Sequence, residues 1–191
     1  MIDRAVAVLA AQLDETLRER FGSSVPVAAA GAVPDLGKDP SALPAQPVVL
    51  TLVRVEEDRI ARSPVATRKR SDGAIEEVQP EVKLHLYLLV CVAAKEYVDS
   101  LRYLAAVVGF FQSKPCFDNS NTPALDPAMG KIIVELAPLT FEEQSNLWGM
   151  LSVRYLPSVL YRARTVVAQE SSISRLLPPV SSIETDLFGH P

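Results

Sequence analysis

The chain has 191 residues, a length that suits one domain, or one domain with appended arms, and in which two full domains would be crowded. Hydrophobic residues make up 48% of it and charged residues 22%, which is typical of a globular protein and excludes a wholly disordered one. A formal charge of −4 excludes a global electrostatic attraction to nucleic acid or to an anionic membrane, and no run approaches the roughly 18 to 20 apolar residues that span a bilayer. We expect a chain that is made in the cytoplasm.

The amino-terminal quarter predicts a helix, a loop and a strand. Apolar residues recur at steps of three and four from Ile2 to Phe21, which predicts an amphipathic helix that ends at Gly22. Five prolines between residues 23 and 47 predict a long Pro-rich surface loop. The β-branched residues of 48–55 predict the first core strand.

The order of charges that follows this strand predicts a projecting hairpin. A basic run is followed by an acidic one, and a two-residue turn at 72–73 would make Lys69 face Glu76. Arg68 would then face Glu77, so that opposite charges meet across the two strands. The charged residues expected on this hairpin arm, which covers residues 57–80, are Arg59, Arg62, Arg68, Lys69, Arg70, Glu76 and Glu77.

The middle of the chain predicts the centre of the fold. Apolar residues at the even positions of 82–92 form one continuous face, which predicts the central strand of a sheet. The next segment predicts a second helix, because six apolar residues repeat at helical spacing until Lys114-Pro115 ends the pattern. The residues expected to face the core are Val98, Leu101, Leu104, Ala105, Val108 and Phe111.

The remaining elements complete an α+β domain over residues 1–168. Residues 131–136 predict a short strand, Thr140 followed by Glu143 is a capping box that opens a third helix, and residues 158–167 predict the last strand. We therefore predict a mixed four-stranded sheet packed by about three helices.

The segment 169–191 cannot build a core of its own. Its Ser and Pro residues with isolated apolar side chains predict either disorder or an arm that orders against a partner, so we treat residues 169–191 as a carboxy-terminal arm. The apolar residues expected to take part in assembly are Leu176, Leu177, Leu187 and Phe188.

A search for reactive groups predicts neither catalysis nor a metal or cofactor. The only histidines are His85 and His190, and His85 lies roughly 20 Å along its strand from Cys91, too far to share a metal ion. No nucleophile elbow and no glycine-rich phosphate loop occurs. Two alternatives stay open: an enzyme of unrecognised type, and a nucleic-acid-binding module that uses the basic run 59–70, although that run has no aromatic residue to stack on bases.

Two groups of motifs resemble a known family. The first covers residues 84–89, 101–104 and 109–112, and the second covers Leu147-Trp148 and residues 155–161, leading to Arg164. In order and spacing they resemble the cap proteins of contractile injection systems of the virulence-cassette and antifeeding-prophage type. The motif residues expected to have structural roles are Tyr87, Phe110, Phe111, Gln112, Trp148, Tyr155, Pro157, Ser158, Tyr161 and Arg164.

This resemblance implies a structural tail terminator. Such a subunit would form a ring, expected to have six copies, on the last ring of the inner tube, and it would contact the terminal sheath ring. It would stop polymerisation and thereby fix the length of a phage-tail-like particle. That particle could stay in the cell or be released from it. Its partners would be itself, the inner-tube protein and the sheath protein, with no nucleic acid and no membrane.

Overall fold

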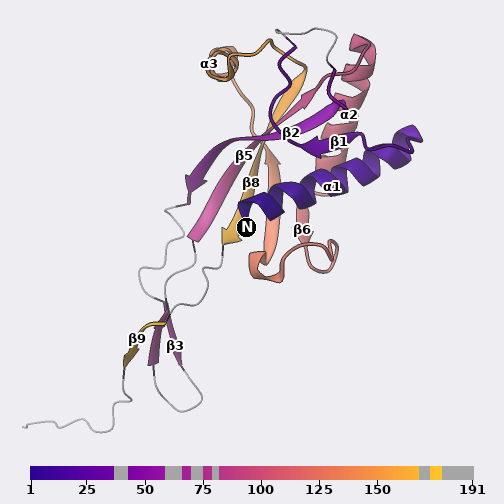
Figure 1. The fold of residues 1–191 in the computed structure, drawn as a ribbon. Helices are drawn as coiled ribbons and strands as arrows, with labels where there is room; N and C mark the ends of the chain where they lie inside the picture. Colours follow the sequence, from indigo (N-terminus) through magenta and orange to yellow (C-terminus); the bar gives the residue numbers. More distant parts are fainter. Residues whose placement is uncertain (37–42, 59–65, 70–74, 79–81, 168–172, 178–191) are drawn as a thin grey trace, which may run out of the picture.

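A six-stranded mixed sheet forms the centre of the molecule (Figure 1). The structure is a computed structural model that describes residues 1–36, 43–58, 66–69, 75–78, 82–167 and 173–177. In spatial order the strands are β1 (Ala28–Ala30), β2 (Val48–Glu57), β5 (Val82–Val92), β8 (Ser158–Val167), β7 (Lys131–Leu136) and β6 (Cys116–Asp118). The pair β1–β2 is parallel and the other pairs are antiparallel.

The α+β class is confirmed, but the predicted number of strands is wrong. The four predicted strands correspond to β2, β5, β7 and β8, and the long β5 lies between β2 and β8 as a central strand should. The two strands that the prediction lacks, β1 and β6, have three residues each and lie at the edges of the sheet. Three residues are too few to show an alternating pattern, so the sequence carries no local signal for them.

Strand β1 lies inside the segment 23–47 that was predicted to be a loop, and a distant side chain holds it in place. Asp14 projects from the first helix, and its Oδ1 accepts the backbone N–H groups of Val27 at 2.6 Å and Ala28 at 2.8 Å. These bonds fix the start of β1 against that helix, while the backbone of β1 pairs with β2. Charged acceptors make the stronger class of hydrogen bond, so Asp14 compensates for the poor strand propensity of three alanines.

We expect Asp14→Ala to lower the free energy of unfolding by about 2–3 kcal/mol, because two buried N–H groups lose a charged acceptor. Asp14→Asn keeps an oxygen acceptor at the same position and should cost about 1 kcal/mol. Urea unfolding of both variants measures the difference. Equal losses for the two variants would contradict this role of the carboxylate.

The three predicted helices are confirmed as α1 (Ile2–Phe21), α2 (Tyr97–Ser113) and α3 (Phe141–Leu151). Helix α1 ends at Gly22, which has a left-handed φ of 63° and donates its N–H to the carbonyl of Arg18. Helix α3 begins with the predicted capping box, in which Glu143 N–H donates to Thr140 Oγ1 at 3.2 Å and Thr140 N–H donates to Glu143 Oε2 at 2.8 Å.

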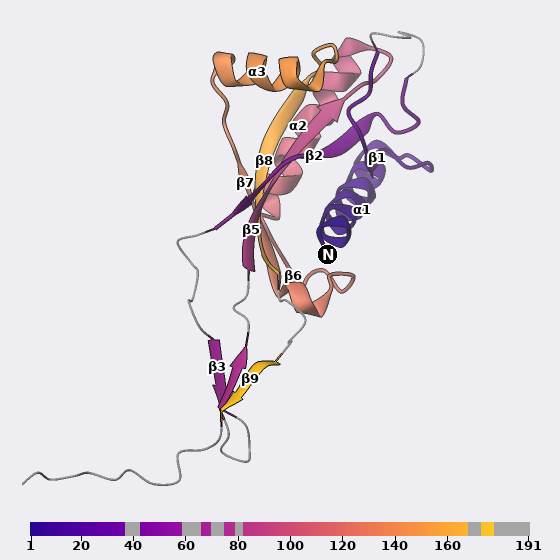
Figure 2. The same cartoon turned by 60° about the vertical axis from the view of Figure 1, so that its left-hand side comes forward.

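The helices cover the two faces of the sheet unequally. Helices α1 and α2 lie on one face, where they enclose the larger core with the even-numbered residues of β5 from Leu86 to Val92. Helix α3 covers only part of the other face, where Trp148 packs near Leu89 and Leu160 in a smaller cluster (Figure 2). Farther along that face, His85 and Tyr87 of β5 lie beside Arg164 and Arg162 of β8.

A second sheet of three short strands lies apart from the main sheet (Figure 2). It consists of β3 (Ala66–Lys69), β4 (Ile75–Val78) and β9 (Ile173–Leu177), in the order β3-β4-β9. We call it the arm sheet. Its β3 and β4 are the two strands of the charged hairpin, and they pair antiparallel.

The register of this hairpin differs from the predicted one by a single residue. Lys69 pairs with Ile75 and Arg68 pairs with Glu76, so residues 70–74 connect the strands, in place of the predicted two-residue turn at 72–73. Charge pairs at an exposed hairpin are worth too little to fix a register against the geometry of the connection. The predicted pairs of Lys69 with Glu76 and of Arg68 with Glu77 are therefore wrong, although Arg68 still faces a glutamate.

Part of the predicted carboxy-terminal arm is the third strand of the arm sheet. Strand β9 pairs antiparallel with β4 of the same chain, and Leu177 lies opposite Ile75. Because Ile75 is the first residue of β4, β9 ends beside the hairpin connection 70–74, at the end of the arm sheet that is far from the main sheet (Figure 2). Leu177, the last residue of β9, therefore lies at the end of the arm sheet that is far from the main sheet (Figure 2).

Candidate assembly surfaces

Helix α2 presents an apolar stripe to solvent. Val98, Leu101 and Val108 are 58%, 44% and 38% exposed, and Ala105 between them is exposed as well. These four residues, which we call the α2 stripe, were predicted to face the core, and that prediction is wrong. The core side of the helix carries Ser100, Ala106, Val107, Phe110 and Phe111, with Tyr103 and Leu104 partly buried.

The physical reason for this error is that α2 is apolar nearly all round. A helical period shows that a helix forms, but with apolar residues on several sides it does not show which side is buried. Solvent-exposed apolar residues scattered singly need no explanation, whereas a row at steps of three, four and three residues along one helix forms a contiguous patch. Such a patch is typical of a surface that is covered in an assembly.

A groove lies between the carboxyl end of α2 and the outer edge of β7. It has a volume of about 460 Å³, and its walls are mainly apolar. Val108 of the α2 stripe forms one side, and Leu136, which is 56% exposed, forms the other. The other lining residues are Phe111, Gln112, Pro115, Val134, Glu135 and Tyr161.

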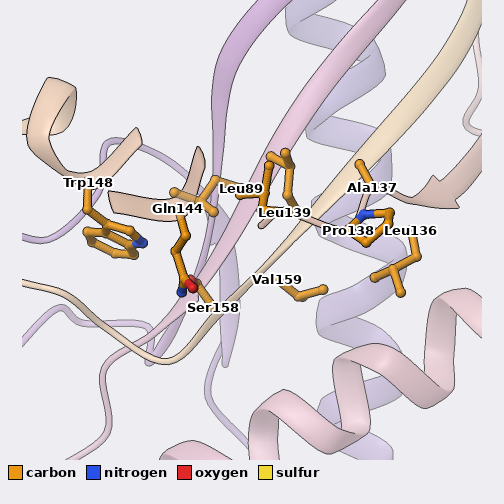
Figure 3. A pocket seen from close by; sticks show the side chains of 10 residues that line it. Leu89, Leu136, Ala137, Pro138, Leu139, Gln144, Trp148, Ser158 and Val159 are labelled. Atoms are coloured by element: carbon orange, nitrogen blue, oxygen red, sulfur yellow. The ribbon is translucent and has the colours of Figure 1, made fainter. Parts of the chain in front are cut away.

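A second hollow lies on the other face, between α3 and the ends of β7 and β8 (Figure 3). It has a volume of about 210 Å³, and Leu136 at the end of β7 lines both it and the groove on the opposite face. Trp148 and Gln144 enter it from α3, and Ser158 enters it from β8 (Figure 3). We call this the α3 hollow.

The carboxylate of Glu135 joins two strands on the same face of the sheet as the α3 hollow. Glu135 on β7 accepts from Arg162 at 3.0 Å and also binds Arg164, the neighbouring arginine on the same face of β8. The hydrogen bond from Arg162 and the charge of Arg164 hold the pKa of Glu135 below its ordinary value of 4.5. Two cations share one anion, so this part of the surface keeps a net positive charge.

We expect the contribution of Glu135 to stability to depend on pH. Its pKa is lower in the folded state than in the unfolded state, so the contribution is present above pH 4.5 and is lost as pH falls through the lowered folded value. The pairs are partly exposed, so Glu135→Gln should cost under about 1 kcal/mol at neutral pH. Urea unfolding near neutrality and in acid measures the cost, and an equal cost at both would contradict the ion-pair explanation.

The family-motif residues divide between packing and surface roles. Phe110, Phe111, Phe117 and Tyr161 form an aromatic cluster between α2 and the sheet, in which the rings of Phe111 and Tyr161 lie 4.5 Å apart. Burial raises the pKa of Tyr161 to about 12. Gln112 is exposed at the rim of the groove, where Phe111 and Tyr161 form part of the floor.

The other motif residues lie on the opposite face of the sheet, around the α3 hollow and beside the charged residues near Glu135. Trp148 packs edge-on against Tyr155 at 5.3 Å, and the carbonyl of Pro157 accepts the N–H of Val92 at 2.9 Å. The hydroxyl of Tyr87 donates to Glu56 at 3.0 Å, and Arg54 lies over its ring. The family motifs in the sequence pointed to Tyr87, Trp148, Tyr155 and Pro157. They did not indicate the α2 stripe or the groove.

The structure places only part of the predicted arm interface. Backbone positions are described for Arg68, Lys69, Glu76 and Glu77 on the hairpin and for Leu176 and Leu177 on β9. They come together in one sheet, as three strands of the same arm. Other predicted residues, Arg59, Arg62, Arg70, Leu187 and Phe188, lie outside the described residues. A nucleic-acid role for the run 59–70 therefore stays an untested alternative.

The residues searched for chemistry have packing or pairing roles. His85 Nε2 lies 3.5 Å from Asp58 Oδ2 at the sheet surface, and Cys91 is buried, which raises the pKa of its thiol to about 12. Within the described ranges, Cys91 and Cys116 are both free, and no three His, Cys, Asp or Glu side chains gather closely enough to hold a metal ion. In that same part of the chain, none of the helices has the length and apolar character needed to cross a bilayer.

Two solved structures are similar to this chain. One is an extracellular contractile injection system, the PVC sheath/tube terminator in its extended state, with a TM-score of 0.59 and 15% identity over 96% of this chain and 63% of that one. The other is the tube-terminating cap of the anti-feeding prophage, with a TM-score of 0.53 and 15% identity over 91% of this chain and 59% of that one. At this identity the likeness shows a shared fold.

This chain thus spans about three fifths of the length of those two chains. Comparison with curated proteins found no match. The model of one family, described as the Pvc16 N-terminal domain, matches residues 5–182, which is nearly the whole chain. Together with the two solved structures, this match confirms the resemblance to cap proteins seen in the sequence motifs, and the chain belongs to the Pvc16 N-terminal domain family.

Proposed function

We propose that this chain is a structural cap subunit that forms a closed ring, of six copies, on the end of the inner tube of a contractile injection system. The ring stops growth of the tube, contacts the terminal sheath ring and thereby fixes particle length. It acts by assembly and not by catalysis. Family membership supports this role, since the similar solved structures are described as a sheath/tube terminator and a tube-terminating cap.

The α2 stripe is the observation that carries the proposal. The stripe is an apolar row on the outside of a folded domain, made of Val98, Leu101, Ala105 and Val108. Contact between apolar side chains and water is unfavourable, and association of two copies would remove it by burying the row. A ring requires a heterologous interface, in which one patch meets a different patch of the next copy. The stripe is one such patch, and it differs from the charged surface around Glu135 on the opposite face of the sheet.

The arm sheet suits contacts outside the ring. It is a separate sheet that lies apart from the main sheet, so it could contact a neighbouring tube or sheath subunit without disturbing the main core (Figure 2). Short strands at its two edges, β3 and β9, leave backbone groups that can pair with a further strand. A contact of this kind would link the cap to its neighbours through backbone hydrogen bonds.

Native mass spectrometry of the full chain, over a concentration series, tests ring formation. The proposal predicts one discrete oligomer of six copies that grows at the expense of the monomer as concentration rises. An open ladder of sizes would indicate a non-closing interface, and a monomer at every concentration up to the highest reached would contradict self-assembly. A dimer alone would indicate a two-fold interface and would contradict it equally.

A further inference from the structure

Phe141, the first residue of α3, is the most exposed large apolar side chain among the described residues, with 92% of its surface exposed. It stands on a fixed turn, because the capping box between Thr140 and Glu143 holds the start of the helix. Figure 2 shows that α3 begins at the end of the helix that lies away from α2. A phenyl ring held outward in this way contacts water over nearly all of its surface, which is unfavourable until another surface covers it.

The groove between α2 and β7 has the size and the apolar character to receive such a ring. Its volume is about 460 Å³, whereas an apolar cavity of about 150 Å³ is enough to hold benzene. Phe111 and Tyr161, whose rings lie 4.5 Å apart, form part of its floor and can pack against an incoming aromatic ring. The one charged residue in its lining, Glu135, has its carboxylate bound to Arg162 and Arg164. An inserted phenyl ring therefore meets mainly apolar walls.

We propose that Phe141 of a second copy inserts into the groove between α2 and β7, and that this insertion is the head-to-tail contact of the ring. The phenyl ring then packs between Val108 on one side of the groove and Leu136 on the other. The inference deepens the proposed function, on which it rests, because it names the part of the next copy that lies beside the α2 stripe.

The two parts of this contact lie on opposite faces of the same chain. Val134 and Tyr161 in the groove belong to the larger core, on the side of α1 and α2, whereas α3 packs on the other face of the sheet. A two-fold dimer needs one self-complementary patch, whereas a head-to-tail row joins two different patches at every contact. Each copy then provides one projecting ring and one groove, as a closed ring of identical subunits requires.

The groove continues the α2 stripe, which favours the next copy as the occupant. Val108 belongs to both, and Leu136, which is 56% exposed, forms the opposite rim. A stable interface buries roughly 800 Å² on each partner, which the four partly exposed side chains of the stripe cannot supply alone. One aromatic side chain buries roughly 150–250 Å², so Phe141 adds a large apolar contact next to the stripe. The copy that covers the stripe is thus well placed to fill the groove.

Sedimentation velocity of Phe141→Ala over a concentration series tests the projecting ring. Truncation of a central aromatic residue weakens association by on the order of 30-fold, so the concentration at which half of the chain is assembled should rise by at least that factor. Phe141 is exposed in the single chain, so urea unfolding of the variant should match that of the unchanged chain.

The matched control is Met150→Ala, which removes another large apolar side chain from the surface of α3. Met150 is 65% exposed and lies half a turn around the helix from Phe141. The control should assemble as the unchanged chain does.

A double-mutant cycle with Leu136→Ala tests the receiving surface. Leu136 forms the rim of the groove, and its replacement alone should weaken association roughly 3- to 10-fold. If Phe141 lies against Leu136 of the next copy, the double variant should lose clearly less than the product of the two single effects, because the shared contact is lost only once. Met150→Ala combined with Leu136→Ala should give the product.

The outcomes separate this inference from the proposed function. Unchanged assembly of Phe141→Ala, or single effects that multiply in the cycle, would overturn the insertion of Phe141 while the ring stands. Weaker assembly of Leu136→Ala with unchanged assembly of Phe141→Ala would show that the groove holds another segment, which also overturns the inference. Absence of self-association in the unchanged chain would count against the cap function itself, and against the inference that rests on it.

Discussion

Aspartate at both Leu101 and Val108 is expected to leave the chain folded and to abolish its self-association. Both side chains are more than a third exposed in the single chain, so their replacement, including the lower helix propensity of aspartate, should lower the free energy of unfolding by only about 1–2 kcal/mol. In the proposed ring they are buried, and each aspartate would then be a desolvated charge without a partner. Central interface residues are worth about 2 kcal/mol or more each, so the double variant should weaken association roughly 1,000-fold if the two effects add.

Sedimentation velocity measures this loss, and Ala7→Asp with Ala11→Asp is the matched control. Those two residues are exposed on α1, outside the α2 stripe, and the change adds the same charge to a helix surface. The control should assemble as the unchanged chain does. Equal assembly of both double variants would show that the α2 stripe is not an interface, and equal loss in both would point to net charge and not to the stripe.

Truncation after Ala168 should leave a stable body that fails to cap. The main sheet keeps all six strands, so its free energy of unfolding should change by less than about 1 kcal/mol, as for surface changes outside the core. The arm sheet loses β9, and the hairpin of β3 and β4 that remains is marginal, because two isolated strands are rarely stable in water. Hydrogen exchange at residues 66–69 and 75–78 should therefore become faster.

The control truncation ends after Leu177 and keeps β9. It should retain slow exchange in β4, because β9 still pairs with it, while it lacks residues 178–191. The length of particles assembled with each truncation gives the functional result. Normal particle length with the shorter truncation product, 1–168, would contradict a role for both the arm sheet and the tail.

The elements that could be predicted are those that carry their own period. Helix α1 has one apolar side and a glycine stop, and β5 alternates over eleven residues, so local sequence decides both structures. The capping box of Thr140 and Glu143 likewise contains both partners within four residues. For such elements the stabilising contacts are near in sequence, and pattern reasoning is sufficient.

The features that could not be predicted depend on distant contacts. Strand β1 needs Asp14 of α1, and nothing within three alanines indicates it. The buried side of α2 is decided by where the sheet and α1 lie, because Leu101 and Phe110 are both apolar and differ only in their neighbours. The strands of the arm hairpin pair one residue out of the predicted register. The prediction rested on charge pairs across the two strands, which are too weak to set the register.

The candidate surfaces show the same division. Family motifs pointed to Trp148, Tyr155 and Tyr161, but they did not show that Phe141 is exposed or that Tyr161 forms part of the floor of a groove. The groove arises where α2, β7 and β8 meet, from segments that are separate in the sequence. Such a site becomes visible only when packing is known, since no single segment contains it.

Electron microscopy of inner tubes polymerised with and without this chain tests the central claim most directly. We expect a ring of density on one end of each tube and a mean tube length that falls as the proportion of this chain rises, with the Leu101→Asp, Val108→Asp variant leaving length unchanged. Bare tube ends and a length distribution that does not respond to the unchanged chain would contradict a capping role.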